Sequence, residues 1–229
     1  LGFIDSELFD NDIVEAIRLF NIDPTKIERD QENGCYSMKI ESSKLPVLPE
    51  GYAYKGGAAR ALLFEALGIS KDEVVRDLDV VRISEEEPYE GADEYVSKTF
   101  MSEDYEFGHG VEQIVNIKAY LKSRDLTINE VLAVGDMVYV TKEALRDSIR
   151  KILRITDEER SRFEGEYRFG MPHKLMAKMV RFYAESIISH DDKNSFYIDP
   201  EQKHIIEESF IFPFYIAVHL DRAFQSGED

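Results

Sequence analysis

Residues 52–83 read YAYKGGAARALLFEALGISKDEVVRDLDVVRI, and the rest of the chain is organised around this stretch. Its first four residues are typical of a short strand, and the glycine pair at 56–57 predicts a tight turn where the backbone can approach a ligand closely. Residues 58–67 are helix formers with an apolar stripe, and Gly68 is suited to end the helix. The run VVRI at 80–83, with three β-branched residues, predicts a second strand.

Two acidic residues stand at the start of this second strand. Asp77 and Asp79 flank Leu78, and on an extended strand residues i and i+2 project from the same face while the residue between them turns to the core. Neighbouring carboxylates repel unless a cation lies between them, and Mg²⁺ prefers oxygen ligands that it shares with substrate phosphates. An Asp-x-Asp pair alone is usually solvated surface. Combined with the glycine turn and helix N-terminus, which can hold phosphates, it predicts a metal and triphosphate site.

These motifs resemble those of the DNA polymerase beta-like nucleotidyltransferases, and most closely the class II CCA-adding enzymes and bacterial poly(A) polymerases. Residues 56–60 (GGAAR) and 77–79 (DLD) are similar to the family pattern Gly-Gly-x-x-Arg-Asp followed by Asp-x-Asp. Residues 123–129 (SRDLTIN) are similar to its Arg-Arg-Asp-Phe-Thr-Ile-Asn motif, and residues 178–182 (KMVRF) are a weaker echo of its Arg-Ala-x-Arg-Phe. The resemblance covers roughly residues 50–190.

The resemblance implies an α+β fold, with a small mixed β-sheet (a palm-like nucleotidyltransferase head) followed by a helical neck. We expect the head at residues 51–140 and the helical neck and C-terminal domain at residues 141–229. Residues 1–50 match no part of the family and are expected to pack on the head as an extension. The implied catalytic residues and metal ligands are Asp77 and Asp79, with Mg²⁺, or Mn²⁺ in its place, as the cofactor.

The same resemblance implies how a nucleotide is held. The implied nucleotide-binding residues are Gly56, Gly57, Arg60, Arg124, Asp125, Asn129 and Arg181. The glycines and Arg60 would hold the triphosphate, Arg124 and Asp125 would hold phosphate and ribose through charge-assisted hydrogen bonds, and Asn129 would brace the loop. In the implied two-metal reaction, an acceptor hydroxyl attacks the α-phosphorus of ATP or CTP and pyrophosphate leaves. The acceptor that fits the family is an RNA 3′ end, as in tRNA processing.

Departures from the family pattern keep other functions open. Ala61 replaces an aspartate, Ser123 replaces an arginine, and Glu130 stands where a small residue is usual. The base-selecting Glu-Asp-x-x-Arg motif has no clean copy. Nucleotidyl transfer to a protein or small-molecule acceptor is therefore one alternative, and a non-catalytic nucleotide-binding or partner-binding module is another. Glu112, on a strand expected beside the Asp-x-Asp strand, is a candidate third carboxylate.

The net charge of −18 argues against broad, non-specific binding of nucleic acid. The charge is uneven, because residues 84–106 hold nine acidic residues and one lysine, whereas residues 141–190 hold eleven basic and eight acidic residues. The C-terminal half can therefore still accept a phosphate backbone locally. The acidic segment is expected to be a solvated loop.

The chain has 229 residues and 43% hydrophobic content, which is enough to bury the core of one or two domains. No run of 18 apolar residues is present and no signal segment is recognisable, so we expect no membrane partner. Because Cys35 is the single cysteine, the sequence excludes an internal disulfide and any multi-cysteine zinc site, and a cytoplasmic location is the default expectation. The oligomeric state stays open.

Periodicity predicts the outer parts of the chain. Apolar residues at helical spacing predict a helix over residues 13–20, polar residues 21–33 are expected to form a loop, and alternation predicts a strand over residues 35–40. Everything from Thr141 onward is expected to be helical, beginning with an apolar stripe that runs to Leu153.

Between these parts, three more elements are expected. Alternating residues predict a strand over 111–117. Residues 127–133 are expected to form a helix capped by Thr127, with Glu130 reaching back in a capping box. A hairpin strand is expected over residues 135–140.

Overall fold

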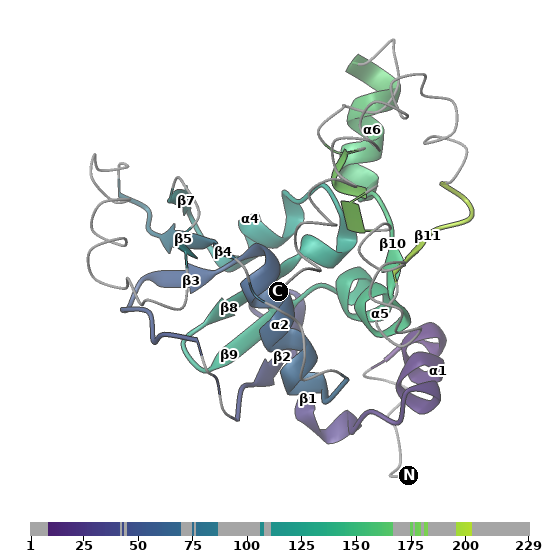
Figure 1. Ribbon diagram of the computed structural model, residues 1–229, viewed down its shortest axis with the longest axis horizontal. Helices are drawn as coiled ribbons and strands as arrows, with labels where there is room; N and C mark the ends of the chain where they lie inside the picture. Colours follow the sequence, from purple (N-terminus) through teal and green to yellow (C-terminus); the bar gives the residue numbers. More distant parts are fainter. Residues whose placement is uncertain are drawn as a thin grey trace. The chain divides into compact units, whose positions relative to one another are not determined.

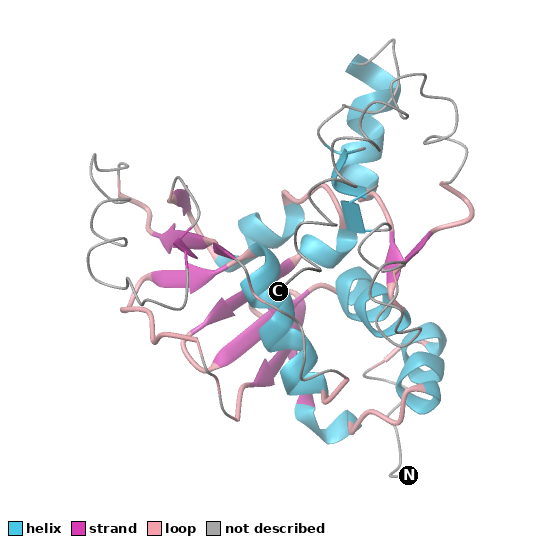
Figure 2. Cartoon of the chain, viewed as in Figure 1, coloured by secondary structure: helices cyan, strands magenta, loops and turns pink. Residues whose placement is uncertain are grey.

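The structure is a computed structural model, and it describes residues 9–41, 43, 45–69, 75, 77–86, 106–107, 111–166, 175, 177–179, 181–182 and 196–202. The chain divides into two compact units, one made of residues 1–123 and 129–149 and the other of residues 124–128 and 150–229. Figure 1 labels the elements, and Figure 2 distinguishes helices from strands. Most of the predicted acidic loop, at residues 87–105, lies outside the described residues.

A seven-stranded mixed sheet forms the centre of the first unit, in the order β1-β2-β9-β8-β3-β5-β7. Its strands are β1 (Ile27–Asp30), β2 (Cys35–Lys39), β3 (Tyr52–Tyr54), β5 (Val80–Ile83), β7 (Glu112–Ile114), β8 (Val131–Val134) and β9 (Met137–Val140). Neighbouring strands are antiparallel except β5 and β7, which are parallel. A separate parallel pair joins β4 (Asp77–Leu78) to β6 (Glu106–Phe107). The predicted α+β class with a mixed sheet is confirmed.

Strand alternation gives this sheet two apolar faces. The helices of the unit are α1 (Asn11–Leu19), α2 (Gly56–Leu67), α4 (Ile117–Lys122) and α5 (Lys142–Arg150). On one face, α1, α2 and α5 belong to the same buried cluster as Tyr54 and Val80, and Figure 1 shows α2 running across the sheet. On the other face, Tyr120 of α4 packs in a cluster with Ala53 and Val81. Successive residues of β3 and β5 therefore face opposite ways.

The N-terminal predictions are confirmed except at one strand. The predicted helix is α1, and the predicted strand over 35–40 is β2. The expected loop over residues 21–33 is wrong, because Pro24–Lys26 form a short 3₁₀ helix (η1) and residues 27–30 form β1. Only the first residue of β1, Ile27, is buried, and it pairs with Met38 of β2. A strand at the edge of a sheet needs few apolar residues, so its polar sequence resembled a loop.

The predicted capping-box helix over residues 127–133 is wrong. Only one 3₁₀ turn forms, η2 (Thr127–Asn129), and β8 begins at Val131. The Thr127 N–H donates to the carbonyl oxygen of Arg154 at 2.9 Å, while the Glu130 carboxylate accepts a hydrogen bond from the Thr141 hydroxyl. Because β8 is a central strand covered on both faces, its sequence VLAV is continuously apolar and carries no alternation that would distinguish it from a helix.

The predicted strand over residues 111–117 is confirmed only as far as Ile114. Beyond it, the side-chain oxygen of Asn116 accepts a hydrogen bond from the Ala119 N–H at 2.8 Å and caps α4, which begins at Ile117. The hairpin strand predicted over residues 135–140 is confirmed as β9, with the turn at residues 135–136.

The expectation that everything after Thr141 is helical is also wrong. Helix α5 ends at Arg150, and Lys151 follows with a left-handed φ of 56°. The second unit then forms β10 (Ile152–Leu153), which pairs in parallel with β11 (Tyr197–Ile198), and helix α6 (Asp157–Glu166). The Gln202 side chain donates to and accepts from the backbone of Ile155, at 3.2 and 2.7 Å. A pairing partner distant in sequence therefore turned an apolar helical stripe into a strand.

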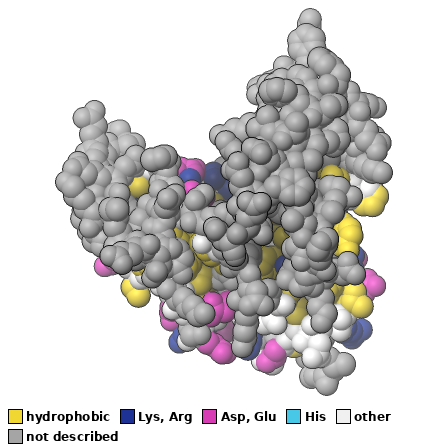
Figure 3. Space-filling model, in the orientation of Figure 1, with side chains coloured by type: hydrophobic (Ala, Val, Ile, Leu, Met, Phe, Trp, Pro, Cys, Tyr) yellow, Lys and Arg dark blue, Asp and Glu magenta, His cyan; other side chains and the backbone are white. Residues whose placement is uncertain are grey.

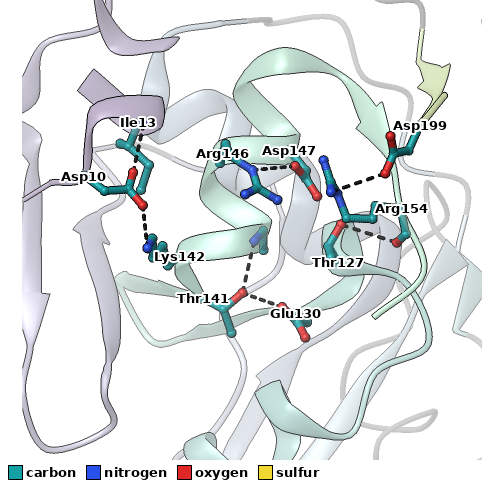
Figure 4. A network of polar contacts seen from close by, with 11 residues as sticks. Asp10, Ile13, Thr127, Glu130, Thr141, Lys142, Arg146, Asp147, Arg154 and Asp199 are labelled. Carbon is teal, nitrogen blue, oxygen red and sulfur yellow. Dashed lines mark hydrogen bonds and ion pairs between the residues drawn. The ribbon is translucent and has the colours of Figure 1, made fainter. Parts of the chain in front are cut away.

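Asp10 connects α1 to α5, as Figure 4 shows. Its carboxylate accepts a hydrogen bond from the Ile13 N–H at 3.1 Å and forms an ion pair with Lys142. Burial acts to raise the pKa of Asp10, but the hydrogen bonds from Lys142 and Ile13 outweigh it, so that pKa lies below the ordinary value of 3.8. The lowered pKa means that the folded state favours the ionised carboxylate.

Replacing Asp10 by alanine is expected to lower the free energy of unfolding by about 1 kcal/mol, because the helix loses its N-cap. Since the folded-state pKa is lowered, the ionic part of this stabilisation is present above the ordinary pKa and is lost as pH falls through the folded pKa. Urea unfolding at pH 7 and at about pH 3 checks this, and the difference between wild type and variant should shrink at the lower pH. An equal difference at both pH values would contradict it. Lys142→Met, which keeps the cap, should cost less.

Candidate functional site

The predicted glycine turn lies against Asp79. Strand β3 ends at Tyr54, and Lys55 is the N-cap residue of α2. The Lys55 N–H donates to the backbone carbonyl of Asp79 at 2.9 Å. Gly56 has a left-handed φ of 58°, and a Cβ placed on it would lie 2.7 Å from Oδ2 of Asp79. The Asp79 carboxylate therefore sits directly against the backbone of Gly56, at a position that only glycine can fill without displacement.

The neighbouring carboxylate is described only in part. The backbone of Asp77 belongs to β4, but its side chain lies outside the described residues. Leu78 is fully buried in the cluster beneath α2, as expected for the residue between two carboxylates that face the other way. The side-by-side placement of Asp77 and Asp79 therefore stays a prediction.

Arg60, predicted to bind the triphosphate, lies inside the first unit. The residue is only 6% exposed, and Asn129 is 9% exposed. The Arg60 Nη1 donates to Oδ1 of Asn129 at 2.7 Å. This hydrogen bond ties the first turns of α2 to the end of η2, which is the bracing role predicted for Asn129. The roles of Arg60, Gly57 and Asn129 toward a nucleotide stay predictions.

Replacing Arg60 by methionine is expected to lower the free energy of unfolding by roughly 2 kcal/mol, because it leaves the buried Asn129 amide without this partner. Asn129→Leu should cost a similar amount, and the double variant should cost much less than the sum of the two. Chemical unfolding of the four proteins without nucleotide measures this coupling. Additive effects, or a stable Arg60→Met protein, would contradict the bracing role.

Glu112, the candidate third carboxylate, already has a cationic partner. It lies on β7 opposite Val81 of β5. Its Oε2 is 2.9 Å from the Nζ of Lys55, with the side chains 33% and 20% exposed respectively. The sequence interpretation missed Lys55. The available signal for Lys55 was its position directly before the glycines and two residues after Ala53. Strand alternation places a residue at that position on the same side of the sheet as Asp79.

The remaining predicted residues belong to the second unit. Asp125 accepts a hydrogen bond from the Leu126 N–H at 2.9 Å and forms an ion pair with Lys178. The Thr156 hydroxyl donates to the Arg124 carbonyl at 2.7 Å, and the Arg181 guanidinium lies 5.4 Å from the centre of the Phe182 ring. Lys178 was not predicted as an Asp125 partner, although it opens the KMVRF echo. The nucleotide-binding roles of Arg124, Asp125 and Arg181 stay predictions.

The carboxylate at the glycine turn suits a hard divalent cation. In the described part of the chain, no three His, Cys, Asp or Glu side chains are grouped so that they could hold a metal ion. The Asp77 side chain is not in that part. Mg²⁺ usually takes one or two protein carboxylates and completes its shell with water and substrate phosphates, so the oxygen of Asp79 fits Mg²⁺ better than a soft metal.

The described surface mixes both signs of charge. Figure 3 shows acidic side chains in magenta interspersed with Lys and Arg in blue on one face of the molecule. Within the ranges that the structure describes, no helix combines the length and apolar character needed to cross a membrane.

No protein-family model matches the chain, and no curated protein matches it by sequence. Three solved structures are similar to part of it. The Bacillus stearothermophilus CCA-adding enzyme in complex with CTP is 20% identical to this chain. The match covers 68% of this chain and 38% of that enzyme, with a TM-score of 0.41. The Thermotoga maritima CCA-adding enzyme complexed with tRNA is 15% identical. Its match covers 75% of this chain and 41% of that enzyme, with a TM-score of 0.44. A CCA-adding enzyme in complex with ATP is 15% identical. Its match covers 76% of this chain and 42% of that enzyme, also with a TM-score of 0.44. This chain thus spans about two fifths of the length of each.

Proposed function

We propose that this chain is a metal-dependent nucleotidyltransferase that transfers NMP from ATP or CTP to an acceptor hydroxyl, with an RNA 3′ end as the preferred acceptor. The observation that supports this most is the contact between the Asp79 carboxylate and the backbone of Gly56. A carboxylate oxygen, the kind of ligand that Mg²⁺ prefers, therefore lies beside a turn whose backbone can approach phosphates. The order of the Gly-Gly, Asp-x-Asp and Arg-Asp motifs in the sequence supports the same chemistry.

Each residue of the turn has a defined task in this proposal. Asp77 and Asp79 would hold Mg²⁺, or Mn²⁺ in its place, and the cation would neutralise phosphate charge and lower the pKa of the attacking hydroxyl. The hydrogen bond from the Lys55 N–H to the Asp79 carbonyl fixes the start of β5 against the turn. Gly56 and Gly57 carry no side chain that would keep a triphosphate away from the backbone of the turn.

Two further groups of residues have tasks in this proposal. Arg60 would keep α2 in place through Asn129, so that the first turn of the helix does not shift when the nucleotide binds. In the second unit, Arg124, Asp125 and Arg181 are proposed to hold the ribose and phosphates. The ion pair with Lys178 would orient the Asp125 carboxylate for that task.

The charge of the chain favours a second candidate. A net charge of −18, with acidic side chains interspersed on the described surface, opposes a long phosphate backbone. Transfer of NMP to a protein or small-molecule hydroxyl would use the same carboxylates and turn without that repulsion. A non-catalytic nucleotide-binding module is the third possibility.

Labelled nucleotides separate the three candidates. The protein is incubated with each α-³²P-labelled NTP and Mg²⁺, together with tRNA lacking its 3′-terminal nucleotides or with a cell extract. Label in RNA supports the proposed function, and label in protein or a small metabolite supports the second candidate. Nucleotide binding without transfer in either mixture would overturn both and leave the binding module. EDTA should abolish any labelling.

A further inference from the structure

A lysine and a glutamate lie beside Asp79 on the same side of the sheet. Ala53 and Val81 face the cluster covered by α4, and Lys55 and Asp79 are each two residues from them along the chain. Glu112 is opposite Val81 on the neighbouring strand. Strand alternation therefore brings an ammonium and two carboxylates from three adjacent chain segments to one place at the glycine turn.

The ion pair between Lys55 and Glu112 adds little to the fold. The β3–β5 and β5–β7 ladders already fix these strands by backbone hydrogen bonds. Both side chains are part-buried but keep some exposure to solvent, at 20% and 33%. Their exposure means that the ammonium can reach a ligand at the turn without unfolding any element.

We propose that Lys55 is a polyphosphate-binding residue of this site and that Glu112 holds its ammonium when no ligand is present. This inference rests on the proposed function, because it assigns a further residue to the same turn. When a triphosphate binds, the Nζ of Lys55 leaves Oε2 of Glu112 and donates to phosphate oxygens, which carry more charge than one carboxylate. Glu112 competes for the ammonium and repels the incoming anion, so the two residues act on affinity in opposite directions.

The test measures binding of inorganic tripolyphosphate to the full chain in EDTA by calorimetry, so that neither metal nor turnover contributes. Lys55→Met is expected to weaken binding about tenfold, since a hydrogen bond to a charged group is lost. Lys55→Arg should keep the affinity within about threefold of the wild type. Glu112→Gln is expected to tighten binding about threefold, and this gain should shrink in the Lys55→Met background.

A matched control comes from a second lysine–glutamate pair in the same unit. Lys26 and Glu41 are also 2.9 Å apart but lie on the exposed surface. Lys26→Met and Glu41→Gln change the charge identically and should leave tripolyphosphate binding unchanged. Circular dichroism and thermal unfolding establish that each variant is folded.

Several outcomes would overturn the inference. It fails if wild type does not bind tripolyphosphate, if Lys55→Met behaves like Lys26→Met, or if Glu112→Gln weakens binding. Failure of this inference and failure of the proposed function give different results. Lys55-dependent tripolyphosphate binding in a protein that transfers no label supports the inference and refutes the proposed enzymatic function. Label transfer by a protein whose tripolyphosphate binding is unchanged in Lys55→Met supports the enzymatic function and refutes the inference.

Discussion

Replacing Asp79 by asparagine is expected to reduce the rate of nucleotidyl transfer more than about 100-fold. Even the residues that hydrogen-bond to metal ligands lower metal affinity or activity roughly 10–100-fold when they are removed. The variant keeps the size of the side chain next to Gly56, so the fold should survive. A neutral amide, however, cannot hold the cation against the triphosphate. Initial rates of label transfer at saturating NTP and Mg²⁺ give the comparison, and Asp77→Asn is expected to show a loss of the same size.

The control for Asp79 is a carboxylate with the same charge elsewhere in the first unit. Asp136 lies in the exposed β8–β9 turn, where its side chain is 68% exposed and 3.7 Å from Lys39. Asp136→Asn should therefore transfer label at the wild-type rate. Full NTP-dependent activity in Asp79→Asn would remove the carboxylate from the chemistry and with it the proposed function.

The second large effect is expected from a single methyl group. Gly56→Ala places a Cβ 2.7 Å from Oδ2 of Asp79, at a residue whose φ is 58°. The left-handed backbone costs about 1–2 kcal/mol of stability, and the clash pushes the carboxylate away from the turn. Because misplacement by about 1 Å can cost 100-fold in rate, we expect activity to fall about 100-fold in protein that is still folded.

A substitution at Gly68 separates the loss of stability caused by the left-handed backbone from the loss of rate caused by the clash with Asp79. It ends α2 with a φ of 70°, but a Cβ there would meet nothing within 4 Å. Gly68→Ala should therefore lose a similar amount of stability, about 1–2 kcal/mol, while its rate per folded molecule stays close to that of the wild type. Equal rates for Gly56→Ala and Gly68→Ala would show that the Asp79 contact has no part in the reaction.

The elements of the first unit were predictable where residues close in sequence decide them. The helix α2, its glycine start and end, and the strands β2 and β3 were all expected near their observed bounds. Prediction failed at β1, β8 and β10. The residues of each of these strands suit more than one local conformation, and pairing with another strand decides between them.

The candidate site shows the same division. The sequence predicted that Asp79 faces the glycine turn but not that its carboxylate lies directly against Gly56, and it considered Glu112 without its partner Lys55. Arg60 was predicted to bind the triphosphate, which stays a prediction, but its burial and its hydrogen bond to Asn129 were not foreseen. An arginine has the same sequence signature whether it binds phosphate or braces a loop, because only its surroundings in the folded chain decide which group it meets.

By itself, the sequence determined the glycine turn before a helix and a pair of aspartates at the start of a strand, since these depend on the backbone preferences of neighbouring residues. The α+β class followed from the resemblance of its motifs to a known family. The tertiary structure alone decided that Asp79 lies against Gly56, that Lys55 pairs with Glu112 and that β8 is a central strand. These arrangements depend on which strands pair and in what register, and that is settled by the burial of the whole sheet between its covering helices.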